Sequence, residues 1–190
     1  MHALRYRLAG TTWKEVLARL TTLDYRAAVV GPHGCGKTTF LEDLAVRLEE
    51  RGFRMRQVTL HEGERRLSLE QEETLFEKVD ARDFLLLDGA EQLAARAWRR
   101  ADRKSRVAGG LVITSHRAGL LPTLFECRTT VELLAGLVRD LLGEKADGLS
   151  PTPEELVVRH HGNLRDALRE LYDLWAARAY LLDEGRASDP

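Results

Sequence analysis

Gly31-Pro32-His33-Gly34-Cys35-Gly36-Lys37-Thr38 fits the pattern G-x-x-x-x-G-K-[ST], which is typical of a phosphate-binding loop. The apolar, β-branched run 26–30 before it predicts a buried strand, and residues 39–51 after it have the apolar spacing of a helix. A strand, a glycine loop and a helix N-terminus in that order direct backbone N–H groups into one concavity. The stretch therefore predicts a nucleotide site made by the loop and the following Thr39.

The composition is that of an ordinary globular protein of 190 residues, with 44% apolar and 31% charged side chains. A net charge of −1 does not by itself favour binding to nucleic acid or to a membrane surface. Cys35 and Cys127 are too few for a disulfide framework, and no apolar run approaches a membrane span. Nothing at the N-terminus resembles a signal peptide. We expect a cytoplasmic protein with no membrane contact.

Two further apolar runs end in polar residues and predict buried strands. Phe84–Asp88 ends in a carboxylate, and Leu111–His116 ends in Thr114, Ser115 and His116. Ligands of open α/β sheets lie at the carboxyl ends of the strands. We therefore expect Asp88 to hold Mg²⁺, and one of the three polar residues to lie near the γ-phosphate or the attacking water. Runs at 55–60 and 127–131 complete a prediction of five strands, which alternate with helices.

Several capped helices are predicted between these strands. Thr12-Trp13-Lys14-Glu15 has the form of a capping box, as do residues 68–71 and 152–155. Trp13 either packs in the core or stacks on a nucleotide base. A helix over 91–106 carries basic residues at i, i+3, i+4 and i+7, namely Arg96, Arg99, Arg100 and Arg103. They form either a solvated face or a contact stripe for nucleic acid or an acidic partner.

Together these motifs resemble the AAA+ ATPase superfamily and its close P-loop relatives. The loop matches Walker A, Phe84–Asp88 matches Walker B, and Thr114-Ser115 resembles the sensor 1 position. Gly162-Asn163-Leu164-Arg165, at the start of a helix, resembles sensor 2 of the family's lid. The resemblance covers nearly the whole chain. It implies an α/β fold, a P-loop NTPase three-layer sandwich with a five-stranded, mainly parallel sheet and a short helical lid.

The resemblance also implies roles and boundaries. Residues 1–142 would form the nucleotide-binding core, with an N-terminal helix in 1–25, and residues 143–190 the lid and tail. Lys37 and the loop amides would bind the phosphates of ATP, and Thr38 with Asp88 would hold Mg²⁺. Thr114 or Ser115 would orient water, and Arg165 would reach the γ-phosphate from the lid.

The sequence departs from the family pattern directly after Asp88. The catalytic glutamate of these ATPases follows the Walker B aspartate, and Gly89 stands in that place. Glu91 is either the replacement base or a first-turn acid of the next helix. Arg117 and Arg128 are candidate arginine fingers for a neighbouring subunit. The lid is short for the family, which leaves self-assembly into a homo-oligomer open.

The leading functional prediction is a Mg²⁺-dependent ATPase switch or motor subunit that is coupled to a protein partner, with slow or partner-dependent hydrolysis. The first alternative is a small nucleotide or metabolite kinase, which would share the phosphate loop. The second is a non-hydrolysing module that binds nucleic acid or protein through the arginine stripe. The sequence does not distinguish ATP from GTP.

Overall fold

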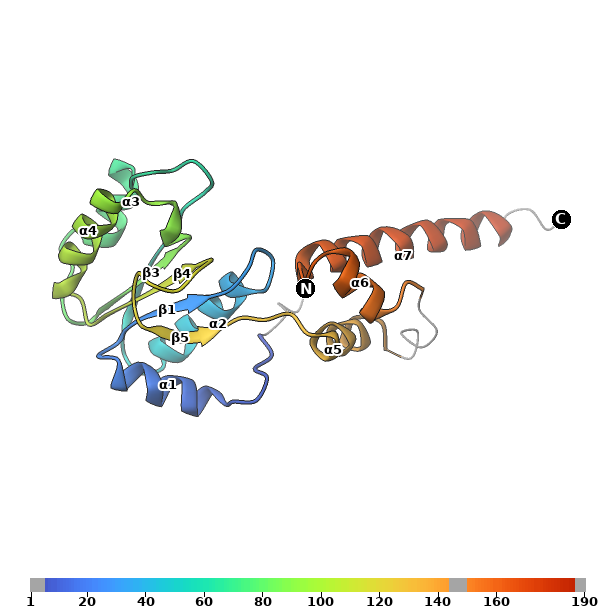
Figure 1. The fold of residues 1–190 in the computed structure, drawn as a ribbon, viewed down its shortest axis with the longest axis horizontal. Helices are drawn as coiled ribbons and strands as arrows, with labels where there is room; N and C mark the ends of the chain where they lie inside the picture. Colours follow the sequence, from blue (N-terminus) through green and yellow to red (C-terminus); the bar gives the residue numbers. More distant parts are fainter. Residues whose placement is uncertain (1–5, 144–149, 187–190) are drawn as a thin grey trace. The chain divides into compact units, whose positions relative to one another are not determined.

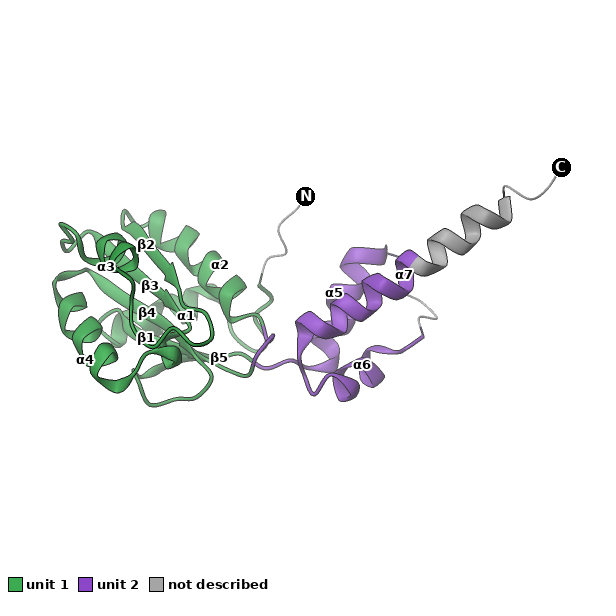
Figure 2. Cartoon of the chain, turned by 90° about the horizontal axis from the view of Figure 1, so that it is seen from above, with its two compact units in different colours: residues 1–32, 36–127 green, residues 33–35, 128–190 purple. Residues whose placement is uncertain are grey.

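The chain forms two compact units, which Figure 2 colours separately. A computed structural model describes residues 6–143 and 150–186, with side chains described as far as residue 176 of the last helix. Residues 1–32 and 36–127 make one unit, and residues 33–35 and 128–190 make the other. We call them the α/β unit and the helical unit and describe each by itself. Residues 144–149 and 187–190 of the predicted lid and tail lie outside the described part of the chain.

A parallel sheet forms the centre of the α/β unit (Figure 1). Its strands are β1 (Arg26–Val30), β2 (Arg54–Thr59), β3 (Asp83–Asp88), β4 (Gly110–Ser115) and β5 (Thr123–Glu126). Their order in the 5-stranded sheet is β2-β3-β4-β1-β5, and every neighbouring pair is parallel. This confirms the predicted α/β fold. The carboxyl ends of all strands meet at one edge, where the loops that follow β1, β3 and β4 emerge.

Helices cover both faces of this sheet. They are α1 (Trp13–Thr22), α2 (Lys37–Glu49), α3 (Leu69–Phe76) and α4 (Ala95–Lys104), with short 3₁₀ turns at Ala90–Gln92 (η1) and Ser105–Val107 (η2). The predicted capping boxes at Thr12 and Ser68 are both present. In each, the hydroxyl accepts from an N–H of the first turn and an acidic or amide side chain returns to the cap, which fixes where the helix begins.

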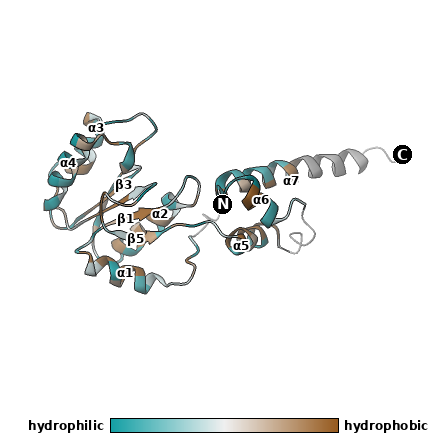
Figure 3. Ribbon diagram, in the orientation of Figure 1, coloured by the Kyte–Doolittle hydropathy of each residue, from teal (hydrophilic) through white to brown (hydrophobic). Residues whose placement is uncertain are grey.

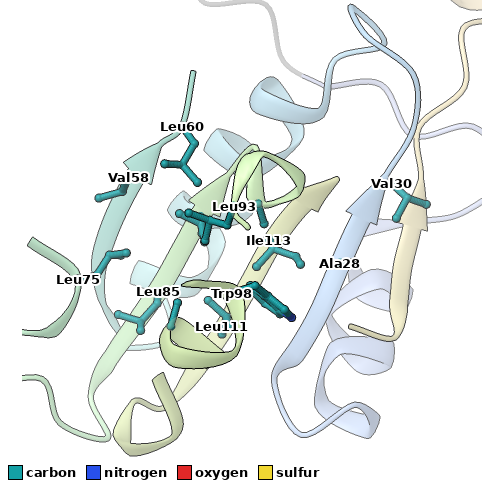
Figure 4. Packing of buried hydrophobic residues seen from close by; sticks show 13 residues of the cluster. Ala28, Val30, Val58, Leu60, Leu75, Leu85, Leu93, Trp98, Leu111 and Ile113 are labelled. Atoms are coloured by element: carbon teal, nitrogen blue, oxygen red, sulfur yellow. The ribbon is translucent and has the colours of Figure 1, made fainter. Parts of the chain in front are cut away.

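The core between the sheet and the pair α3 and α4 is continuous and apolar. Figure 4 shows Trp98 of α4 and Leu93 lying over Leu85, Leu111 and Ile113 of the central strands. Because side chains alternate along a strand, the opposite face of β3 presents Phe84, Leu86 and Asp88 toward α2. The packing fixes β3 between two layers and brings its terminal carboxylate to the carboxyl edge.

Two predicted elements differ from the structure. The predicted helix over 91–106 is wrong at its start, since Leu93 and Ala94 are extended and the chain forms η1, a break and then α4. The break exists because Leu93 is buried in the core and the Ala94 N–H donates to Arg65 O at 2.9 Å. The predicted strand 127–131 is also wrong. The strand is β5, and Thr130 instead caps the next helix.

The helical unit contains α5 (Val131–Leu142), α6 (Pro153–Arg159) and α7 (Leu164–Arg186). Their shared core is Leu134, Val138, Leu156, Ala167 and Leu171. Because α5 packs in this core, the structure groups it with the helical unit, whereas the sequence placed it in residues 1–142. The predicted capping box at Thr152 is present, and Asn163 caps α7 by accepting from the Asp166 N–H at 3.3 Å.

Candidate nucleotide-binding and catalytic site

The phosphate loop leaves β1 and enters α2 through glycines that other residues replace poorly. Gly34 has φ +71° and Gly36 has φ +92°, both in the left-handed region that favours glycine. A Cβ on Gly36 would also lie 3.1 Å from the Tyr6 ring. The N-cap residue of α2 is Gly36, which has no side chain to cap the helix, so the first N–H groups of this helix retain hydrogen-bonding capacity for an anion.

Lys37 is the first residue of α2, and its side chain folds back over the loop. Its Nζ donates to Gly31 O at 2.8 Å and to Pro32 O at 2.7 Å. An ammonium group gains more from a phosphate oxygen than from neutral carbonyls, because a charge-assisted bond to an anion is stronger. The cation is therefore held at the loop by partners that a triphosphate can replace.

Asp88 links β3 to β4 and to the first turn of α2 at the carboxyl edge. Its Oδ2 accepts from the Thr38 hydroxyl at 2.7 Å, and its Oδ1 accepts from the Thr114 hydroxyl at 2.5 Å. The Thr114 hydroxyl in turn accepts from the Gly89 N–H at 2.7 Å. The carboxylate is only 7% exposed and has no ion pair with a described cationic residue. A buried carboxylate that is met only by hydroxyl groups is suited to a metal ion.

Glu91 and His116 meet beside this group. Glu91 lies in η1 after β3, His116 follows β4, and Glu91 Oε1 lies 3.1 Å from His116 Nε2. Glu91 Oε2 is buried and has no hydrogen-bond partner among the residues that the structure describes. Buried carboxylate oxygens are normally hydrogen-bonded, so an unsatisfied one is a candidate position for a functional water.

The glycine after Asp88 is required by the local backbone. Gly89 has φ +84°, and a Cβ at this position would lie 2.8 Å from Leu60 O. A glutamate at 89 would be strained in this conformation and would also press on the neighbouring chain. A side chain directly after the aspartate is therefore disfavoured, and Glu91 is an acidic residue that the structure brings to this edge.

Other predicted site residues are less directly placed. The Ser115 hydroxyl donates to Arg117 O at 2.8 Å, so it stabilises the loop that follows β4. His33, Gly34 and Cys35 group with the helical unit. Arg165 also belongs to that unit and is exposed in the first turn of α7. Its predicted contact with the γ-phosphate, like the finger roles of Arg117 and Arg128, stays a prediction.

Tyr6, which lies before α1, packs beside the phosphate loop and was not predicted from the sequence. Its ring makes edge contacts with Phe40 and Phe125, at centroid distances of 5.2 and 5.8 Å, and its N–H donates to Asp43 at 2.6 Å. The ring centroids of Trp13 and Phe40 lie 4.9 Å apart, and Arg47 Cζ lies 4.1 Å from the Trp13 ring centroid. These contacts favour packing over base stacking for Trp13. A lone tyrosine near a terminus carries no pattern that would have indicated this position.

The residues present fit Mg²⁺. This ion prefers oxygen ligands and is usually held by one or two protein groups together with substrate phosphates. Thr38 and Asp88 provide a hydroxyl and a carboxylate whose oxygens already lie 2.7 Å apart. They are the residues that would hold the ion.

Comparisons with known proteins find similarity of fold only. No protein-family profile matches the chain, and no curated protein matches its sequence. Among solved structures, a RuvB variant from Thermotoga maritima matches with a TM-score of 0.55 and 19% identity over 83% of this chain and 60% of that one. RuvB from the same organism, described as a Holliday junction branch migration motor, gives 0.53 and 19%, over 82% and 58%. A DNA replication initiation factor gives 0.55 and 16%, over 92% and 63%.

The fold is that of a P-loop NTPase. The similar structures are AAA+ P-loop ATPases, in agreement with the resemblance of the motifs. This chain spans about three fifths of the length of those structures. Within the described residues, no helix is both long and apolar enough to cross a membrane.

Proposed function

We propose that this chain binds ATP at the Gly31–Thr39 loop and hydrolyses it with Mg²⁺, as a switch or motor subunit that is coupled to a partner. The observation that supports it most directly is the 2.7 Å bond between Thr38 and Asp88. It joins the end of the phosphate loop to the end of β3, where the metal of a phosphoryl-transfer site belongs.

In this site the protein mainly positions groups and offsets negative charge. Lys37 and the N–H groups at the start of α2 bind the phosphates, and Thr114 holds Asp88 in place. Mg²⁺, when bound, neutralises charge on the phosphate oxygens. Glu91 accepts a proton from the attacking water at Oε2, while His116 fixes the carboxylate through Oε1.

A direct test measures ATP binding and Mg²⁺-dependent phosphate release by the purified chain. Lys37→Ala is expected to weaken ATP binding and to abolish release, because the loop loses its cation. Lys14→Ala, at an exposed position of α1, removes a lysine elsewhere and serves as the matched control. Equal turnover by the Lys37 variant and the control would contradict the proposal.

Glu91→Gln separates catalysis from binding. The amide retains the size of the side chain but cannot accept the proton, so ATP affinity is expected to stay within about twofold while turnover falls by about 10²-fold or more. Unchanged turnover would remove Glu91 from the site. Transfer of phosphate to a nucleoside or metabolite, in place of water, would instead favour the kinase alternative.

The structure offers a reason for slow or partner-dependent hydrolysis. Glu91 lies in a short 3₁₀ turn that is bounded by the left-handed Gly89 and the extended Leu93. Small changes in this turn would move the carboxylate, and a partner that acts on the turn would alter the rate. Nucleic acid is one partner class that the arginine stripe supports.

A further inference from the structure

A basic groove lies on the α/β unit where the loop after β2 meets the start of α4. It has a volume of about 710 Å³, and Arg65, Arg66 and Arg96 line it together with Glu64 and Ser68. The loop and α4 are joined by the hydrogen bond from the Ala94 N–H to Arg65 O. Sequence spacing predicted the stripe on α4 but not that the loop arginines lie beside it.

The structure divides the predicted arginine stripe into neutralised and free charges. Glu72 accepts from Arg100 at 3.0 Å and from Lys104 at 2.6 Å, and these contacts, the Lys104 bond first, hold the pKa of Glu72 below its usual range. Arg106 pairs with Asp102 at 3.3 Å. Arg100 and Lys104 are therefore occupied by an internal acid.

The remaining arginines carry uncompensated charge. Arg65, Arg66, Arg96, Arg99 and Arg103 are exposed, and none forms an ion pair with another residue in the described part of the chain. Glu64 is the acidic residue that lines the groove, and its carboxylate accepts a hydrogen bond from the His61 backbone N–H at 2.6 Å. Figure 3 shows the corresponding hydrophilic colouring of α4. The surface thus combines a groove with a row of guanidinium groups that have no ion pair with a described residue, although Arg99 Nε also donates to Ala95 O at 3.2 Å.

The spacing of these groups fits a repeating anion. Arg96, Arg99 and Arg103 follow one face of α4 over about 10 Å, given a rise of about 1.5 Å per residue. The phosphates of one nucleic-acid strand repeat along the duplex axis about every 3.4 Å, so this row spans several of them. Arginine forks bind phosphate oxygens through paired hydrogen bonds, which suits backbone contacts that do not depend on sequence.

An acidic protein is the less favoured occupant. Protein interfaces are centred on buried aromatic or large aliphatic groups. The apolar side chains that line this groove are Ala94, Ala97 and Leu67, and Leu67 is already packed against the core of the α/β unit. Leu69, which is 83% exposed directly after Ser68, is the apolar group that a protein partner would use. This residue therefore distinguishes the two classes of partner.

The groove is connected to the catalytic edge through the backbone. Arg65 O holds Ala94, three residues after Glu91, and the Leu60 N–H at the start of the same loop donates to Asp88 O at 2.8 Å. Both ends of the 88–94 segment are thus bonded to the loop that carries the groove arginines. An occupant that pulls on this loop acts on the turn that positions Glu91.

We propose that the groove formed by Arg65, Arg66 and Arg96, extended along α4 by Arg99 and Arg103, binds the phosphate backbone of a nucleic acid, and that its occupancy repositions Glu91. The binding part stands independently of hydrolysis. The coupling part rests on the proposed ATPase function.

The binding test uses fluorescence anisotropy with a labelled mixed-sequence DNA duplex and the matching single strand, over a series of salt concentrations. The Arg66→Glu/Arg96→Glu variant is expected to bind at least about tenfold more weakly, with a salt slope smaller by about 2. Arg51→Glu/Arg82→Glu makes the same charge change at exposed positions near the amino ends of the strands, and is expected to bind within about twofold of the unmodified chain.

Two results with DNA would overturn the proposed binding: no DNA binding by the unmodified chain at low salt, or an equal loss of DNA affinity in the two double variants. A third would be tighter binding of poly-L-glutamate than of DNA, if that binding is lost in Leu69→Ser. Circular dichroism of each variant verifies that it is folded. Leu69→Ser is expected to leave DNA affinity unchanged.

The coupling test compares ATP turnover with and without DNA, each variant against its own DNA-free rate. The unmodified chain and the Arg51/Arg82 variant are expected to change their rate on adding DNA, and the Arg66/Arg96 variant is not. DNA binding without any rate change overturns only the coupling. A chain that binds DNA but never hydrolyses ATP contradicts the proposed function and leaves the groove intact.

Discussion

The two ends of β3 each carry a buried aspartate, and the protein surrounds them differently. Asp83, at the amino end, is 1% exposed and contacts Arg54 Nη2 at 3.0 Å and Arg56 Nε at 3.1 Å. Asp88, at the carboxyl end, is 7% exposed, and within the described residues it accepts only from the hydroxyls of Thr38 and Thr114. The two groups lie on the same strand and are the same residue type, but among the described residues only Asp83 has cationic partners.

This difference separates a charge that the protein neutralises itself, at Asp83, from the charge at the proposed metal site, Asp88. A buried carboxylate costs free energy unless a cation or several donors compensate it. At Asp83, burial raises the pKa, but the Asp80 N–H and the Arg56 guanidinium outweigh it, so the pKa lies below its usual range. At Asp88 no cationic residue of the described part of the chain forms an ion pair, and the carboxylate remains available to a metal ion. The comparison therefore supports the proposed metal site at the carboxyl end of β3.

The largest expected effect is the loss of turnover on Asp88→Asn. The amide removes the anionic metal ligand, so Mg²⁺-dependent ATP hydrolysis is expected to fall by about 10²-fold or more. The matched control is Asp83→Asn, the same change at the other end of β3. Phosphate release measured over a range of Mg²⁺ concentrations should show an altered Mg²⁺ requirement in the first variant alone. A similar loss of turnover in both variants would contradict the different roles given to the two aspartates.

The next largest effect is on stability, and here Asp83→Asn is expected to cost more than Asp88→Asn. Asp83→Asn leaves Arg56 and Arg54 facing a neutral amide, which is expected to lower the free energy of unfolding by about 2 kcal/mol. Asp88→Asn should cost less, because no cation loses its partner. Urea denaturation of both variants measures this, and an equal midpoint for the two would contradict the assignment of Asp83 as the structural charge.

The pH dependence of stability tests the same assignment of Asp83. Because the pKa of Asp83 is lowered in the folded chain, its stabilisation is fully present above the unfolded value of about 3.9 and is lost as pH falls through the folded value. The stability difference between the unmodified chain and Asp83→Asn should therefore be constant near neutral pH and shrink below about pH 4. A stability difference that grows as the pH falls would contradict this prediction.

The smallest expected effect concerns the residue after Asp88. Gly89→Glu restores the family's usual order of residues, but the left-handed backbone and the contact with Leu60 O make it unfavourable by about 1–2 kcal/mol. We expect a less stable chain with no gain in ATP turnover. Gly52→Glu, at a left-handed glycine with open space around it, controls for the backbone strain alone. Faster hydrolysis by Gly89→Glu would mean that the edge can rearrange.

Much of the fold was readable from local patterns. The phosphate loop, the strand that ends at Asp88 and the caps at Thr12, Ser68 and Thr152 were all predicted, because each depends on residues close together in the chain. The predicted helix over 91–106 failed at its start for the opposite reason. The core requires Leu93, and a hydrogen bond to Arg65 from another segment ends the local preference for helix.

By itself, the sequence determined which chemical groups are present: a phosphate loop, an aspartate at the end of an apolar strand, and arginines at helical spacing. The tertiary structure decided how they combine. It placed β3 beside β4, which brings Glu91 to His116 and Thr114 to Asp88, and it used Glu72 to neutralise Arg100 while leaving Arg96 free. Periodicity and capping act over a few residues, whereas these pairings depend on strand order and packing between distant segments, which no local pattern specifies.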